Sequence, residues 1–193
     1  MTAWRVSVGI LLVSLANSFA ASTIREIDFQ NFSYSWPKSV GGVPPSWKWL
    51  DAVPTGSIRL ANGRVEFGES RQFSPAPFVE LISVTYGDLS GDGREEAAVD
   101  LMYKTGGTAD WHYLFIYALA DGSPKLLGLL RSGSRAYGGL VKVAIHEHRL
   151  LLDFSDERKQ IGDCCSEGWV RVGYRLRNGR FVETGARSYG AFK

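Results

Sequence analysis

Nine residues of the chain combine acidic side chains with glycines at spacings that could hold a metal ion. Residues 88–96 (DLSGDGREE), the acidic loop, carry oxygen-bearing side chains at the first, third, fifth and ninth positions and glycine at the sixth. Calcium takes six to eight oxygen ligands, and a loop with this spacing can wrap them around one point. The expected ligands are the side chains of Asp88, Ser90 and Asp92, the carbonyl of Arg94, and Glu96. This pattern predicts a structural calcium site with a dissociation constant of roughly 10⁻⁴–10⁻³ M.

A tight polar turn is the alternative for the same loop. In that case Asp88 and Asp92 accept hydrogen bonds from main-chain N–H groups and bind no ion. The sequence leaves both interpretations open.

The acidic loop resembles the calcium loop of FG-GAP modules, which also joins two strands, although Ser90 and Glu96 replace the more usual Asp or Asn. More widely, residues 24–185 resemble secreted bacterial proteins related to the LppP/LprE lipoproteins. The motifs that carry this resemblance are VTYGDLSGDGREEAAV, GSPKLLGLL, DCCSEG and YRLRNGRFVETG. The resemblance implies a location in the cell envelope or outside the cell and implies no reaction. The chain lacks a lipobox cysteine, so a lipid anchor is not implied.

Cys164 and Cys165 are the only cysteines. Consecutive Cα atoms lie about 3.8 Å apart, which is closer than the usual disulfide range of roughly 4.4–6.8 Å. We expect a vicinal disulfide that stiffens the turn before Trp169. Two free thiols, a bridge to another chain and a redox switch remain as alternatives.

Catalytic chemistry has little support in the sequence. There is no G-x-S-x-G motif, and the three histidines do not single out a Ser–His pair. Several acidic residues could supply the carboxylate pair of a glycoside hydrolase, namely Glu80, Glu95, Glu96, Asp100 and Asp110. The leading hypothesis is therefore a binding module, and a small secreted hydrolase acting on envelope polymers is the alternative. No residue is assigned a catalytic role.

The elements that position these residues are predicted to be β-strands. Apolar residues alternate with period two, and Gly, Asn and Asp recur at short intervals. The pattern predicts a single all-β domain of about ten mostly antiparallel strands, a sandwich or a strongly twisted sheet. Residues 24–34 are expected to form the first strand. Asn62-Gly63 and Asn178-Gly179 predict two-residue hairpin turns with positive φ.

Two segments carry side chains that could bind a partner. Residues 36–56 form a connector rich in proline and glycine, and its tryptophans are expected to clamp it to the sheet, with sugar or partner contacts as the alternative. These tryptophans are Trp36, Trp47 and Trp49. Arg171, Arg175 and Arg177 share one face of a predicted strand, which we interpret as a solvated face, with an anion site as the alternative.

Residues 1–20 have the charged start, apolar centre and small-residue end of a signal peptide. Cleavage after Ala20 leaves residues 21–193, secreted or periplasmic, with no predicted transmembrane segment. The whole chain has 22 Lys and Arg against 20 Asp and Glu, and cleavage removes one Arg. This balance argues against a dedicated nucleic-acid binder. The expected partner is an unknown protein or glycan of the envelope.

Overall fold

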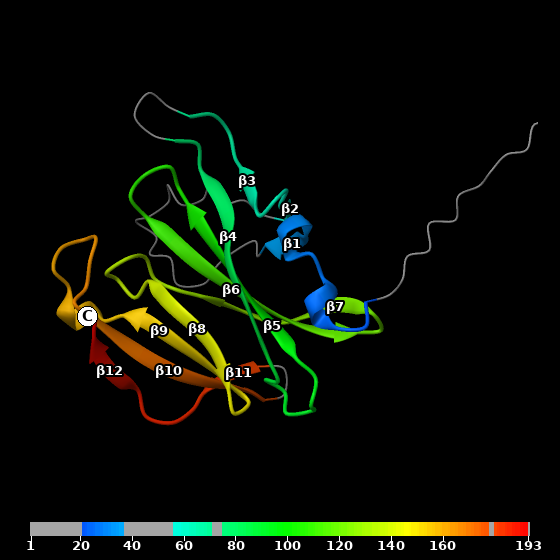
Figure 1. Cartoon of the computed structure of the whole chain (residues 1–193). Coiled ribbons are helices and arrows are strands. Elements are labelled where there is room, and N and C mark those ends of the chain that lie inside the picture. The colour runs from blue at the N-terminus through cyan, green and yellow to red at the C-terminus, as the bar shows by residue number, and fades with distance from the viewer. Residues whose placement is uncertain (1–20, 37–55, 71–74, 178–179, 193) are drawn as a thin grey trace, which may run out of the picture.

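The computed structural model describes residues 21–36, 56–70, 75–177 and 180–192, and they form β-strands joined by turns and short 3₁₀ helices (Figure 1). Every strand pair is antiparallel, which confirms the predicted all-β fold. The strands are β1 (Ser33–Trp36), β2 (Gly56–Arg59), β3 (Arg64–Glu66), β4 (Phe78–Gly87), β5 (Glu96–Lys104), β6 (Asp110–Ala120), β7 (Ser123–Arg131), β8 (Leu140–His146), β9 (Arg149–Ser155), β10 (Gly168–Arg177), β11 (Arg180–Glu183) and β12 (Ser188–Ala191). The 3₁₀ helices are η1 (Ile24–Glu26), η2 (Phe29–Asn31) and η4 (Glu157–Lys159).

The first sheet, in the order β3-β4-β5-β6-β7, is the middle layer of the molecule. One of its faces packs against the N-terminal segment, where Phe29, Tyr34 and Trp36 are buried. Its other face packs against the second sheet through residues such as Leu114 and Leu152. Because both faces are covered, β5 and β6 are buried almost continuously and do not alternate between apolar and polar residues.

The second sheet has the order β11-β10-β9-β8, and β12 pairs with the part of β10 that β11 leaves free. Leu150, Leu152 and Val172 point inward and are buried. Alternate residues of the same strands point to the opposite, outer face. This sheet therefore has one covered face and one face that no described element covers.

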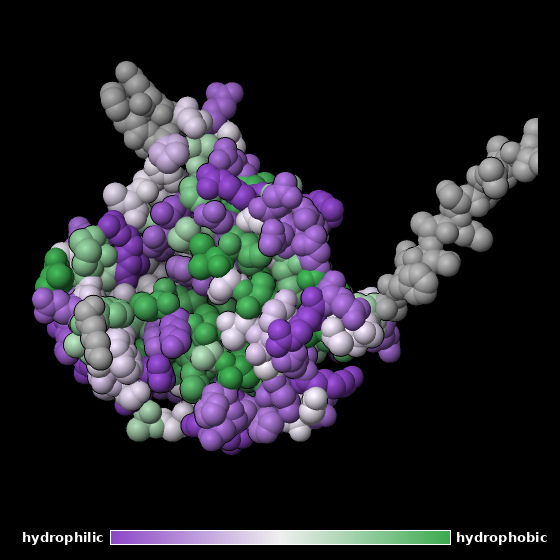
Figure 2. Space-filling model, in the orientation of Figure 1, coloured by the Kyte–Doolittle hydropathy of each residue, from purple (hydrophilic) through white to green (hydrophobic). Residues whose placement is uncertain are grey.

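The first and second sheets approach each other along β4 and β8, which are not hydrogen-bonded to each other. Figure 2 shows hydrophobic residues gathered between these strands and hydrophilic residues around them. Ile82 of β4 and Val141 of β8 are about half exposed, at 45 % and 49 %. The sandwich is thus open along this edge.

The prediction of one strand over residues 24–34 is wrong, because this stretch contains η1 and η2 and becomes extended only from Ser33. The Asp28 carboxylate accepts hydrogen bonds from the main-chain N–H groups of Gln30 and Asn31 and so caps η2. Ile24 and Phe29 are both buried although they would lie on opposite faces of a strand. The two short helices allow both side chains to enter the core.

The Asn62-Gly63 turn is confirmed, with φ of 52° at Asn62 and 81° at Gly63. The residues on either side, Ala61 and Arg64, form a single bridge, since β2 pairs with β1 and β3 pairs with β4. Asn178-Gly179 lies outside the described residues. The strands that flank it, β10 and β11, pair with each other.

The predicted connector begins and ends in paired strands, because Trp36 lies opposite Gly56. Trp36 is buried, and its ring centroid lies 4.3 Å from that of Tyr113, as expected for a residue that clamps the connector to the sheet. Trp47 and Trp49 lie outside the described residues, as do residues 1–20. Within the described ranges, no helix is long and apolar enough to cross a membrane.

Candidate functional site

The acidic loop joins β4 to β5 and is anchored by one apolar side chain. Leu89 is 2 % exposed and packs in the core between the sheets. Gly91 and Gly93 have φ of 82° and 83°, values that favour glycine. The loop therefore turns sharply twice while Leu89 holds it against the body of the molecule.

Two aspartates organise the exposed part of the loop. The Asp88 carboxylate accepts hydrogen bonds from the N–H groups of Gly91 and Gly93, at 2.6 and 3.0 Å. The Asp92 carboxylate accepts from the main-chain N–H of Arg94 at 2.9 Å and from the Arg94 guanidinium at 2.7 Å. These bonds to Arg94 lower the pKa of the Asp92 carboxyl to about 2.

Glu96 occupies the base of the loop. Its carboxylate accepts hydrogen bonds from the N–H groups of Leu89 and Ser90, at 2.7 and 3.0 Å. Glu96 is 3 % exposed, so these bonds satisfy a buried carboxyl group and two main-chain donors together. Glu96, the ninth residue of the loop, thus holds the start of the loop in place from its buried side.

The five predicted calcium ligands lie in one loop, and their carboxylates already have partners. Asp88 and Asp92 accept the main-chain N–H bonds that the polar-turn alternative predicts. Among the described residues, no group of three or more His, Cys, Asp and Glu side chains is arranged to hold a metal ion. The Arg94 guanidinium would compete with a calcium ion for the Asp92 carboxylate. The calcium site therefore stays a prediction.

The turn between β8 and β9 contacts the acidic loop. His148 Nδ1 lies 3.0 Å from the Asp88 carbonyl oxygen and 3.4 Å from the Asp88 carboxylate. The His148 ring also lies close to Gly91. The loop that joins two strands of the first sheet is thereby held against the second sheet.

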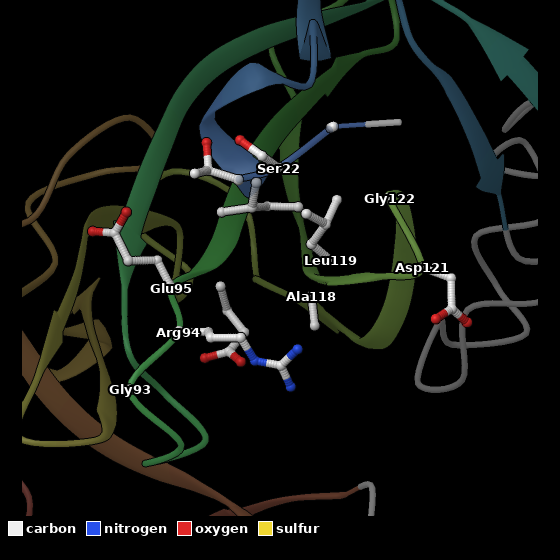
Figure 3. Close-up of a pocket in the computed structure, with 12 residues that line it drawn as sticks. Ser22, Gly93, Arg94, Glu95, Ala118, Leu119, Asp121 and Gly122 are labelled. Atoms are coloured by element: carbon white, nitrogen blue, oxygen red, sulfur yellow. The ribbon is translucent and has the colours of Figure 1, made fainter. Parts of the chain in front are cut away.

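A pocket of about 470 Å³ lies beside the acidic loop, between residues 21–24, residues 93–96 and the turn between β6 and β7. Figure 3 shows the Arg94 side chain reaching below Ala118, with Glu95 and Asp121 at opposite ends. The Arg25 guanidinium bonds Glu95 at 2.7 Å and lowers the pKa of its carboxyl. Glu95 is thus held in its charged form by a structural ion pair.

This pocket does not supply the carboxylate pair that the hydrolase hypothesis needs. A general acid in such an enzyme requires a raised pKa, whereas the pKa of Glu95 is lowered. The Glu96 carboxylate is bonded to the main chain. No aromatic side chain is found among the described residues that line the pocket. The hydrolase hypothesis thus gains no support from this region.

One pair of functional groups could not be identified from the sequence. His112 of β6 places Nδ1 2.8 Å and 3.0 Å from the two carboxylate oxygens of Asp100 in β5. Asp100 is 4 % exposed. The strands were predicted, but only their register reveals this pairing, with Asp100 opposite Leu114 and His112 opposite Met102. The pair ties β5 to β6 from inside the sandwich.

The two cysteines form the predicted vicinal disulfide, and the described residues contain no free cysteine. The pair lies at the exposed tip of a hairpin that Gln160 and Ser166 close with a β-bridge. The neighbouring Asp163 accepts a hydrogen bond of 2.6 Å from the Tyr137 hydroxyl. The disulfide thus stiffens a turn that is also tied to the loop before β8.

Comparisons of the chain with protein-family models, with curated proteins and with solved structures find no match. The resemblance to the LppP/LprE lipoproteins and to FG-GAP loops therefore stays a prediction.

Proposed function

We propose that this protein is an exported, non-enzymatic module that binds a protein or glycan of the cell envelope. The features that support export are the signal-peptide pattern of residues 1–20 and the resemblance to secreted bacterial proteins. The location is the periplasm or the outside of the cell.

A single structural observation carries the binding part of the proposal. The first sheet is covered on both faces by described elements, whereas the outer face of the second sheet is not. A sheet face held in place by strand pairing is a suitable platform for a partner, because little conformational entropy is lost when it binds. The acidic-loop pocket, by contrast, has its acidic groups largely committed to internal bonds.

Calcium stabilisation of the acidic loop belongs to the same proposal. The ion would act on the fold and not on the partner, since the oxygens available to it are those that hold the loop together. Calcium is expected to stabilise the fold at millimolar concentrations.

The test of export and binding uses the full-length chain and a form that starts at Ala21. Expression of the full-length chain, followed by fractionation and intact mass, should give an exported product that begins at Ala21. The exported product should then sediment with isolated envelopes in a saturable way. A full-length chain that stays in the cytoplasm with residues 1–20 still attached would contradict export. Absence of saturable sedimentation would contradict binding.

The same envelope preparation separates the binding module from the hydrolase. A hydrolase releases soluble sugar fragments from the envelope over time, whereas a binding module leaves the polymer intact. Measurement of released reducing ends after incubation with the protein distinguishes the two. Time-dependent release above that of a heat-denatured sample would favour the hydrolase.

A further inference from the structure

The outer face of the second sheet gathers positive charge from four strands. In β10 the inward positions are taken by Val172 and Tyr174, which pack in the core, so the alternate residues point outward. Strand register places outward residues of β8, β9 and β11 on the same face. The cationic residues of this surface, which we call the basic face, are Lys142, Arg149, Arg171, Arg175, Arg177 and Arg180.

Acidic neighbours neutralise only two of these six residues. Arg171 bonds Asp153 at 2.6 Å, and Arg149 bonds Glu147 at 3.0 Å. The side chains of the other four form no hydrogen bond or ion pair with any described residue. These four are Lys142, Arg175, Arg177 and Arg180. The chain as a whole is nearly balanced, with 22 basic and 20 acidic residues, so the excess on this face is local.

Two of the unpaired arginines lie directly opposite each other. Arg177 of β10 faces Arg180 of β11 across the strand pair, and both residues are exposed. Like charges in directly opposed positions destabilise a sheet. An anion bound between the two guanidinium groups would remove this repulsion.

An extended polymer with repeated carboxylates would contact several cationic residues of the basic face at once. Residues two apart on a strand lie about 7 Å apart, and adjacent strands lie about 4.8 Å apart. Arginine binds planar carboxylates through paired hydrogen bonds more effectively than lysine does. Five of the six cationic residues are arginines.

An indole ring lies on the same face as these charges, at the end of β10 that carries Arg171. Trp169 precedes Arg171 on the outer side of β10, and the Arg171 guanidinium lies 5.2 Å from its ring centroid. The ring lies against Gly190 of β12, where a Cβ atom would overlap it. Trp169 is half-buried, so the residue is partly accessible to a ligand on this face.

We infer that the basic face binds a linear polysaccharide whose sugars carry carboxylate groups. The inference rests on the proposed function, since it names the chemical class of the envelope partner. The arginines contact the carboxylates, and Trp169 stacks on a sugar ring.

The test measures binding of the form that starts at Ala21 to polygalacturonate, with neutral dextran as the comparison polymer. Binding to polygalacturonate alone is expected at roughly 0.05 M salt, and it should be largely lost at about 0.5 M salt because exposed charges are screened. The double variant Arg175→Gln, Arg177→Gln should weaken binding about tenfold. A matched control, Arg59→Gln, Lys125→Gln, removes two exposed charges from other strands and should change binding less than about twofold.

The outcomes separate failure of this inference from failure of the proposed function. Equal binding by the double variant and the control, or no binding to polygalacturonate by a protein that sediments with envelopes, would overturn the inference alone. Binding to vesicles of anionic phospholipid but not to the polymer would assign the face to a membrane surface and also overturn it. No binding to envelopes at all would defeat both proposals.

Discussion

The acidic loop and the basic face differ in whether their charged side chains are bonded within the protein. In the loop, Asp88, Asp92 and Glu96 each accept at least two hydrogen bonds from nearby donors. On the basic face, Arg175 and Arg180 form no ion pair with any residue that the structure describes. The charged groups of the acidic loop are thus paired within the protein, whereas those of the basic face are mostly not.

This difference separates charges that hold the fold from charges that can meet a ligand. A carboxylate that already accepts main-chain N–H bonds has fewer lone pairs left for a ligand. A guanidinium in solvent gives up hydration and side-chain freedom but breaks no bond within the protein. The carboxylates of the acidic loop therefore mainly hold the loop together. The arginines of the basic face, which the sequence indicates only as a solvated face, are the better candidates for binding.

The strongest test of the structural role is Glu96→Ala. The change removes the acceptor of the Leu89 and Ser90 N–H groups in a buried place, so the free energy of unfolding should fall by about 3 kcal/mol. Urea unfolding measures the difference. The matched control is Glu95→Ala, whose exposed pair with Arg25 should contribute less than about 1 kcal/mol. Equal losses in the two variants would break the comparison.

Much of the fold could be predicted from the sequence because alternation and turn residues are local signals. The prediction of an all-β fold with mostly antiparallel strands is confirmed, although β5 and β6 are buried on both faces and do not alternate. The first strand was misplaced because the capping of η2 by Asp28 depends on one side chain and overrides the alternation over residues 24–34. Local sequence thus predicts the strands better than it predicts the short 3₁₀ helices.

The basic face could be predicted less completely from the sequence, because it depends on the register between strands. The sequence places Arg171, Arg175 and Arg177 on one face, but Lys142 and Arg180 join them only through pairing with other strands. Pairings of this kind are non-local, and the spacing of residues within one strand does not specify them.

Calcium tests whether the loop can also hold an ion. If the dissociation constant is about 1 mM, then about 10 mM calcium should stabilise the fold by about 1.4 kcal/mol, with magnesium giving much less. Thermal unfolding with chelator, calcium or magnesium measures this. Arg94→Ala should enlarge the calcium effect, because it releases Asp92 from the guanidinium. Identical melting curves in all three conditions, for both proteins, would leave only the polar turn.

The Asp92–Arg94 pair should appear in the acid stability profile. The pKa of Asp92 is lowered to about 2 from an ordinary value of 3.8. A lowered pKa gives stability that is present above about pH 4 and is lost as the pH falls through about 2. Asp92→Asn should therefore be less stable than the unchanged protein at neutral pH, and the gap should close between about pH 4 and pH 2. Unfolding curves across this range measure the gap, and a gap independent of pH would contradict the role of the pair.

The smallest expected effect belongs to the basic face. Arg177→Gln removes one member of the like-charge pair with Arg180 and breaks no hydrogen bond to a described residue. The free energy of unfolding should therefore rise by a few tenths of a kcal/mol, on the order of 0.3, at low salt. The gain should disappear at about 0.5 M salt, because exposed charges are then screened. Arg171→Gln is the contrast: it leaves the nearly buried Asp153 carboxylate without its guanidinium partner and should lower stability at both salt concentrations. A loss of stability in Arg177→Gln like that of Arg171→Gln would show that Arg177 also serves the fold, and the distinction between the two regions would then fail at this position.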